Sequence, residues 1–185
     1  NAEYRLGVTG TLSGAKAHEW VLMGLFGEVY RATTSKELMD KGQLAELTIK
    51  CLLLKYSEEE CQYMKTASYQ EEIEYIVANK PRNEFICNLT LSLEGNTLLL
   101  FNYVEKHGDV LYNMLNTKAK EGRKVFYIHG GTDVESREEI RRIVETETNA
   151  IIVGSVGVRS TGTNMVALSN IVFASPSKSK IRNLQ

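Results

Sequence analysis

The sequence has few of the residues that interrupt or crosslink a chain, with 2 prolines and 3 cysteines among 185 residues. So few prolines, together with only 14 glycines, exclude a linker-rich, collagenous or disordered organisation. No apolar run approaches the roughly 20 residues that cross a bilayer, and residues 1–20 lack the layout of a signal peptide. We therefore expect a soluble, intracellular protein that makes no contact with a membrane.

The cysteines, the histidines and the net charge exclude further classes of site. Cys51, Cys61 and Cys87 form no CxxC pair, so we interpret them as buried thiols in a reducing compartment. The three histidines stand apart without a second ligand at zinc-site spacing, which argues against a metal site. A net charge of -1 gives no overall attraction to nucleic acid. Any contact with DNA must therefore come from local patches.

With 185 residues, of which 43% are hydrophobic and 24% charged, the chain can bury the core of one domain or slightly more. Its C-terminal half alternates between the patterns of strands and helices. The predicted strands there are residues 97–103, 124–129, 150–155 and 171–174. The predicted helices around them are residues 69–78, 83–93, 104–115 and 134–146. This alternation predicts an α/β fold with a mainly parallel sheet, helices on both faces, and functional loops at the carboxyl ends of the strands.

The N-terminal part has weaker patterns of the same two kinds. Residues 17–26 and 36–41 have helical patterns, closed by Gly27 and Gly42. Residues 6–11 and 28–33 are predicted as strands because of their apolar or alternating side chains. Residues 46–56 are nearly continuous in apolar side chains, which predicts a strand covered on both faces.

Four loops at predicted strand ends carry small or polar residues. They are residues 9–11, Asn102 with Tyr103, residues 129–133, and residues 155–164. Each has an ordinary structural alternative, such as a simple turn for residues 9–11 or a core histidine for His129. Residues 160–164 are the most informative, because hydroxyl and amide groups surround a glycine that lets the backbone approach a ligand.

Several nucleotide-binding motifs are missing from the sequence. It contains no Gly-x-x-x-x-Gly-Lys-Ser/Thr phosphate loop, no Gly-x-Gly-x-x-Gly, and no Asp-Glu pair after an apolar strand. These are the parts that would hold ATP phosphates and magnesium. We therefore expect that the chain is not a complete NTPase.

The order and spacing of the loops resemble those of superfamily-two helicases, in the branch that includes type III restriction and XPB-like translocases. Residues 4–12 resemble motif III, with Gly10 and Leu12 where alanine and proline are usual, a variant typical of branched-DNA helicases of tailed phages. The later matches are residues 97–101 to motif IV, residues 127–131 to motif IVa, residues 160–164 to motif V, and residues 177–185 to the start of motif VI. The match covers almost the whole chain.

The resemblance implies a RecA-like three-layer α/β/α fold. Residues 1–45 would be the C-terminal remnant of a first RecA-like domain, and residues 46–185 a second one truncated at its C-terminal end. The parent protein would be an ATP-dependent DNA helicase that uses ATP and Mg²⁺ and acts on branched DNA in phage recombination, repair and replication. The chain alone would be inactive. The alternative is a stand-alone nucleic-acid-binding or regulatory module with the same fold.

The resemblance also implies roles for individual residues. Three residues of motif III would couple the nucleotide state to strand movement: Thr9, Gly10 and Thr11. Three would face the nucleotide: Gly162, Asn164 and Gln185. Six would contact DNA: Phe101, Asn102, His129, Gly130, Ser160 and Thr161. Core packing is the alternative for Phe101, because an aromatic residue that closes a buried strand usually packs. Arg137 is expected to be solvated or salt-bridged rather than a DNA ligand.

Overall fold

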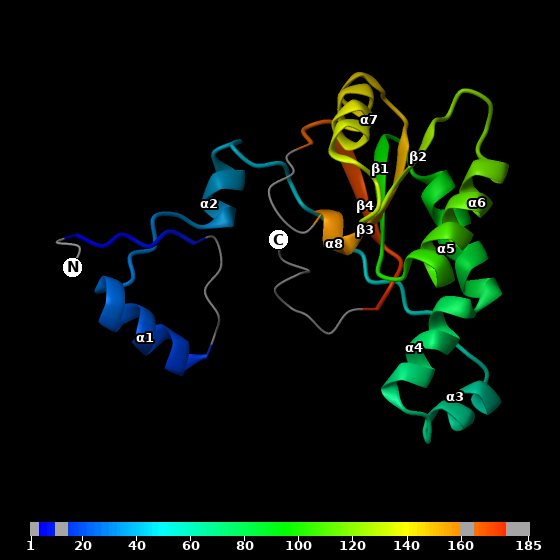
Figure 1. Ribbon diagram of the computed structural model, residues 1–185, viewed down its shortest axis with the longest axis horizontal. Coiled ribbons are helices and arrows are strands. Elements are labelled where there is room, and N and C mark those ends of the chain that lie inside the picture. The colour runs from blue at the N-terminus through cyan, green and yellow to red at the C-terminus, as the bar shows by residue number, and fades with distance from the viewer. Residues whose placement is uncertain (1–3, 10–14, 160–164, 177–185) are drawn as a thin grey trace. The chain divides into compact units, whose positions relative to one another are not determined.

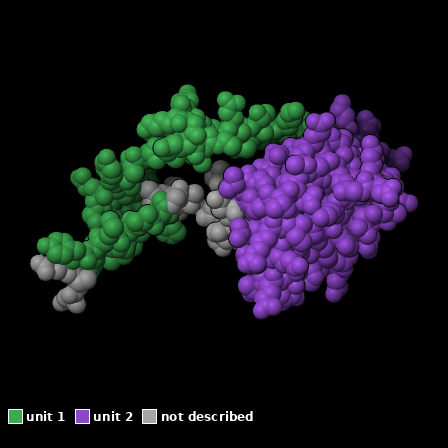
Figure 2. Space-filling model, turned by 90° about the horizontal axis from the view of Figure 1, so that it is seen from above, with its two compact units in different colours: residues 1–53 green, residues 54–185 purple. Residues whose placement is uncertain are grey.

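The computed structural model describes residues 4–9, 15–159 and 165–176, and it divides into two compact units, residues 1–53 and 54–185 (Figure 2). The two units differ in how much apolar surface they bury. No described residue of the first unit is buried, whereas every residue of the hydrophobic core belongs to the second.

The first unit contains two helices. Helix α1 (Lys16–Phe26) ends at Gly27, whose φ of 87° lies in the left-handed region that glycine adopts without strain. Helix α2 (Ser35–Asp40) begins at a capping box of Thr34 and Glu37. Both predicted helices are confirmed, each beginning one residue before its predicted start. The apolar side chains of α1 are largely exposed, with Trp20 at 71%.

The strands predicted for the N-terminal part are absent from its described residues. Residues 6–9, 28–33 and 46–56 form no strand, and Leu53 in the last segment is 92% exposed. Strand propensity expresses packing against neighbouring strands, and the described residues of this unit include no such neighbour.

The prediction of buried thiols is wrong for Cys51 and Cys61, which are exposed, and right for Cys87.

The second unit is built on a four-stranded sheet in which every pairing is parallel. Its strands are β1 (Asn96–Phe101), β2 (Val125–Ile128), β3 (Ile151–Ser155) and β4 (Leu168–Phe173), in the order β2-β3-β1-β4 (Figure 1). Every residue of β1 and β3 is buried, as expected for central strands covered on both faces. The four strands predicted for this part of the chain are therefore confirmed, with ends displaced by up to three residues.

The described helices of this unit lie before the first strand and between successive strands. In chain order they are α3 (Glu58–Met64), α4 (Tyr69–Ala78), α5 (Lys80–Ser92), the π-helix η1 (Val104–Gly108), α6 (Asp109–Lys118), α7 (Val134–Thr146) and α8 (Val156–Arg159). Helices α3 and α8 were not predicted, and the helix predicted for residues 104–115 is divided into η1 and α6. Helices α4 and α7 have the predicted bounds.

Local sequence explains where several of these helices begin. Ser68 and Glu71 form a reciprocal capping box at the start of α4. The Asn79 side chain accepts a hydrogen bond from the Arg82 amide, and Pro81 lies in the first turn of α5. Asp133 caps α7 by accepting a hydrogen bond from the Ser136 amide at 2.8 Å.

The sheet separates two apolar layers, because successive side chains of a strand point to opposite faces. Leu99 and Phe101 of β1 pack in one cluster with residues of α5 and α6, whereas Leu98 and Leu100 pack in the other with Val144 of α7. Figure 1 shows α5 and α6 on one face of the sheet and α7 on the other. The prediction of a three-layer α/β/α arrangement with a parallel sheet is confirmed.

Two side chains brace the amino end of the sheet. Asn96 Nδ2 donates to the carbonyls of Val144 and Glu147, and its Oδ1 accepts from the Ala150 amide at 2.7 Å. Arg123 donates to carbonyls near the end of α5, including that of Leu91 at 2.7 Å. Because these side chains bond to backbone groups, we interpret them as structural residues that tie helices to the amino end of the sheet.

Gly108 provides a test of the packing under β1. A Cβ atom there would lie 2.6 Å from Phe101 Cζ and 2.7 Å from the Tyr127 hydroxyl oxygen, whereas a Cβ at Gly157 in α8 meets nothing within 4 Å. We predict that Gly108→Ala lowers the free energy of unfolding by about 1–3 kcal/mol through overpacking. Gly157→Ala, the control, should leave it unchanged or raise it by up to about 1 kcal/mol. Urea denaturation measures both, and equal stabilities would contradict the packing described.

Candidate functional site

The carboxyl ends of the four strands meet at one edge of the sheet, because all pairings are parallel. Asn102 follows β1 directly, His129 follows β2, and α8 follows β3. Open parallel sheets bind their ligands at this edge. The structure therefore brings Asn102, His129 and Gly130 to the edge where a site is expected.

The residues after β2 form a tight turn that fixes the His129 ring. The His129 amide donates to Thr132 Oγ1 at 3.1 Å, and the Thr132 amide donates back to the His129 carbonyl at 3.0 Å. The Gly131 amide donates to His129 Nδ1 at 3.1 Å, so the proton of the neutral ring is on Nε2. His129 is half-buried at the surface and stacks obliquely on Tyr127, which places it outside the core.

Gly130 and Arg137 have different places in this turn. Gly130 is exposed, and a Cβ atom there would meet nothing within 4 Å, so a ligand can approach its backbone closely. Arg137 donates from Nε and Nη2 to the Thr132 carbonyl at 2.8 and 2.6 Å. Its guanidinium is therefore a brace for the turn, an arrangement that was not among the roles expected for it.

Phe101 and Asn102, adjacent in the chain, lie in opposite surroundings. Phe101 is fully buried and stacks on Tyr127 with ring centroids 5.7 Å apart, so core packing, the alternative expectation for Phe101, is what the structure has. Its ring offers no exposed surface to a DNA strand. Asn102 is exposed, and its Nδ2 donates to the Pro176 carbonyl at 3.1 Å.

A chain of buried polar side chains lies behind this edge and was not predicted from the sequence. His107 Nε2 is 3.1 Å from Asn83 Oδ1, and His107 Nδ1 is 2.9 Å from Ser175 Oγ. All three residues are buried. Ser175 follows β4, so the rule that selected the other strand ends would also have selected it. Nothing in the sequence indicated His107, because its partners are distant in the chain.

The electrostatics of this group follow from burial. Burial lowers the pKa of His107 to about 4, and the positive charge of Arg82 adds to the effect. Burial likewise lowers the pKa of Arg82, whose Nη2 donates to the Ala174 carbonyl at 2.6 Å. Arg82 Nη1 is buried without a hydrogen-bond partner among the described residues. Because the pKa of His107 is lowered to about 4, its ring is neutral at physiological pH.

Most of the remaining predicted site residues lie outside the described residues. They are Gly10, Thr11, Ser160, Thr161, Gly162, Asn164 and Gln185. Thr9 is described, is exposed and belongs to the first unit.

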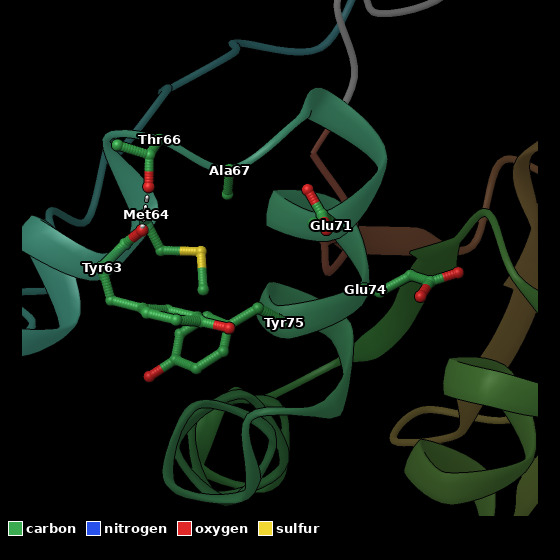
Figure 3. A pocket seen from close by; sticks show the side chains of 7 residues that line it. All are labelled: Tyr63, Met64, Thr66, Ala67, Glu71, Glu74 and Tyr75. Carbon is green, nitrogen blue, oxygen red and sulfur yellow. Dashed lines mark hydrogen bonds between the residues drawn. The ribbon is translucent and has the colours of Figure 1, made fainter.

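A hollow of about 310 Å³ lies between α3 and α4 (Figure 3). Its polar groups are engaged within the chain. Glu71 accepts from the Ser68 amide, Glu74 pairs with Lys106 at 2.8 Å, and the Tyr75 hydroxyl donates to Glu60. Since these groups already have partners, the hollow presents none that calls for a ligand.

Two further kinds of feature are absent from residues 4–9, 15–159 and 165–176. These residues contain no group of three or more His, Cys, Asp or Glu side chains that could hold a metal ion. No helix among them is long and apolar enough to cross a membrane.

The buried His107 makes stability depend on pH in a testable way. Its pKa is 6.5 in the unfolded chain and about 4 in the folded one, so below pH 6.5 the unfolded chain binds a proton that the folded chain does not. Stability from this group is complete above the unfolded pKa and is lost as pH falls toward the folded pKa. We predict a loss of about 2 kcal/mol between about pH 7 and about pH 5. Urea denaturation of wild type and His107→Gln measures it, and identical pH profiles would contradict the assignment.

Comparison with known proteins gave one sequence relative and a matching solved structure, while no protein-family model matches the chain. Over 188 residues, covering the whole chain, it is 35% identical to the ATP-dependent DNA helicase uvsW of Enterobacteria phage T4. The chain spans 37% of the length of that relative. The crystal structure of T4 UvsW matches with a TM-score of 0.61 and 32% identity, over 70% of this chain and 26% of that one.

Sequence and structure thus agree on the same relative. The α/β fold of the chain is RecA-like, as in T4 UvsW, and the fold class predicted from the sequence is confirmed. The resemblance to superfamily-two helicases is confirmed as well, and the chain is similar in sequence and in fold to part of a UvsW-type DNA helicase.

Proposed function

We propose that the chain acts as part of a phage ATP-dependent DNA helicase that moves on branched DNA during recombination, repair and replication in the host cytoplasm. The observation that carries the proposal is the 35% identity to UvsW along the whole chain. In this proposal residues 46–185 belong to the second RecA-like domain, and residues 1–45 are the end of the first. By itself the chain would be inactive.

The phosphates of ATP and the Mg²⁺ ion, which such a helicase uses, are not assigned to residues of this chain. The described part of the chain has no cluster of metal ligands, and the sequence has no phosphate loop. In enzymes of this kind phosphates are held by one set of residues, and transition-state charge is stabilised by arginines from another. We propose that this chain contributes to the DNA track, and that its residues 177–185 lead into the second set.

The proposed DNA contacts lie at or near the carboxyl edge. Asn102 and the turn at His129 and Gly130 present amide, imidazole and backbone groups that suit phosphate oxygens, a kind of contact that positions a strand without reading its sequence. Ser160 and Thr161 would extend this track. The buried ring of Phe101 is not part of this proposed DNA track, and it supports the track from the core.

The remaining proposed roles concern the nucleotide. Gly162, Asn164 and Gln185 would face the nucleotide between the two domains. Thr9, Gly10 and Thr11 would couple nucleotide state to strand movement. These assignments follow the motif order that the sequence shares with superfamily-two helicases.

The 185-residue chain provides the first test. We predict that it hydrolyses ATP no faster than background. We also predict that it binds DNA weakly, since few phosphates are neutralised, with an affinity that falls as salt rises. Fluorescence anisotropy at several salt concentrations and a phosphate-release assay measure these properties. Tight binding at physiological salt would instead support the stand-alone nucleic-acid-binding module, and ATP turnover abolished by a mutation in the chain would refute its proposed inactivity.

The loop of residues 160–164 provides the second test, made in the full-length protein that carries the chain. Thr161→Ala should remove one phosphate contact, typically about 1 kcal/mol and up to roughly 3 kcal/mol beside a charged group. DNA-stimulated ATP hydrolysis should then fall at limiting DNA, while DNA-independent hydrolysis is kept. Asn164→Ala should instead lower hydrolysis at saturating DNA, because its proposed contact depends on domain closure.

Titration of DNA against the ATPase rate distinguishes the two variants. Thr117→Ala on α6 is the matched control, because its hydroxyl bonds only the Asn113 carbonyl of the same helix. Circular dichroism checks that each variant is folded. Wild-type stimulation and unwinding by both loop variants would show that the loop is structural.

A further inference from the structure

The chain that leaves β4 is held by side chains from three distant elements. Arg82 of α5 donates to the Ala174 carbonyl at 2.6 Å, and His107 of η1 contacts Ser175 Oγ at 2.9 Å. The Asn102 amide donates to the same Ser175 oxygen at 3.0 Å, and the Asn102 side chain donates to the Pro176 carbonyl. Three successive residues are thus fixed by groups 68 to 92 residues away in the chain.

The direction of each hydrogen bond in this group is determined. Asn83 Nδ2 donates to the Val77 carbonyl at 2.8 Å, so Asn83 Oδ1 must accept, and His107 Nε2 carries the proton that it accepts. His107 Nδ1 is then an acceptor for the Ser175 hydroxyl, and the Ser175 oxygen accepts from the Asn102 amide. A buried chain of bonds in which each group has one role specifies a single arrangement.

The other strand exits are held differently. The turn after β2 is fixed by bonds among residues 129–137, and β3 continues directly into α8. The exit of β4 is also costly, because burying polar groups is unfavourable relative to packing apolar ones and Arg82 Nη1 has no hydrogen-bond partner among the described residues. Such an arrangement at one exit calls for a reason beyond packing.

We propose that Arg82, Asn83, His107 and Ser175 form a clamp that positions the residues following β4 for ATP hydrolysis, a role that rests on the proposed helicase function. Residues 177–185 resemble the entry to the arginine motif of superfamily-two helicases, so the clamp fixes the chain immediately before that motif. The clamp residues are positioning residues. They set the path of the backbone and touch neither the nucleotide nor DNA.

The test uses Ser175→Ala in the full-length protein that carries the chain. Misplacing groups that act on the transition state lowers kcat and leaves ground-state binding intact. We expect kcat for DNA-stimulated ATP hydrolysis to fall by roughly tenfold or more, with KM for ATP within about twofold of wild type. Ser175→Thr, which keeps the hydroxyl, should recover most of kcat.

A matched control separates positioning from stability. Thr90→Val removes another buried hydroxyl, which bonds the Ile86 carbonyl within α5 at 2.7 Å. It should lower the melting temperature about as much as Ser175→Ala while leaving kcat near wild type below that temperature. Equal kcat for Ser175→Ala and wild type, or an equal fall for Thr90→Val, would overturn the clamp.

A measurement on the unmutated chain keeps the proposal falsifiable if Ser175→Ala does not fold. Nitrogen NMR of the His107 ring should show the proton on Nε2 and a hydrogen-bonded, unprotonated Nδ1 at neutral pH. A proton on Nδ1 would overturn the proposed chain of bonds. If the wild-type full-length protein shows no DNA-stimulated ATPase, the proposed helicase function fails, whereas the NMR result still decides the geometry of the clamp.

Discussion

The pairing of β1 with both β3 and β4 is the constraint on which the second unit depends. All six residues of β1 are buried, so the strand requires a hydrogen-bonded neighbouring strand on each side and apolar side chains over both faces. Parallel neighbours in turn require crossover connections, and α6 and α7 lie in them on opposite faces of the sheet. Together with the pairing of β2 and β3, this pairing brings the carboxyl ends of the strands to one end of the sheet, where Asn102 and His129 lie.

The two edges of the sheet use polar side chains in different ways. At the amino edge, Asn96 and Arg123 bond to backbone carbonyls and tie helices to strands. At the carboxyl edge, His107 bonds to two other side chains, and an exposed turn at His129 lies beyond β2. The first arrangement stabilises the fold. The second combines a fixed interior with accessible groups, as a binding edge needs.

The first unit shows which predicted elements form where no sheet is present among the described residues. Its helices form because capping residues and glycine stops act locally, within a few positions of each other. Its predicted strands do not form in the described residues, because a strand needs a partner at a distance. The side chains of Trp20, in helix α1, and of Leu53 are also exposed.

The sequence by itself determined what depends on local periodicity and chain order: the four strands of the second unit, its helices other than α3, α8 and the π-helix η1, the three-layer parallel fold, and the placement of Asn102 and His129 at strand ends. Periodicity does not say whether a residue at a strand end points inward, so only packing decided that Phe101 is buried against Tyr127. Only tertiary structure brought Asn83, His107 and Ser175 together, because they lie on α5, on η1 and after β4, 24 and 68 residues apart in the chain.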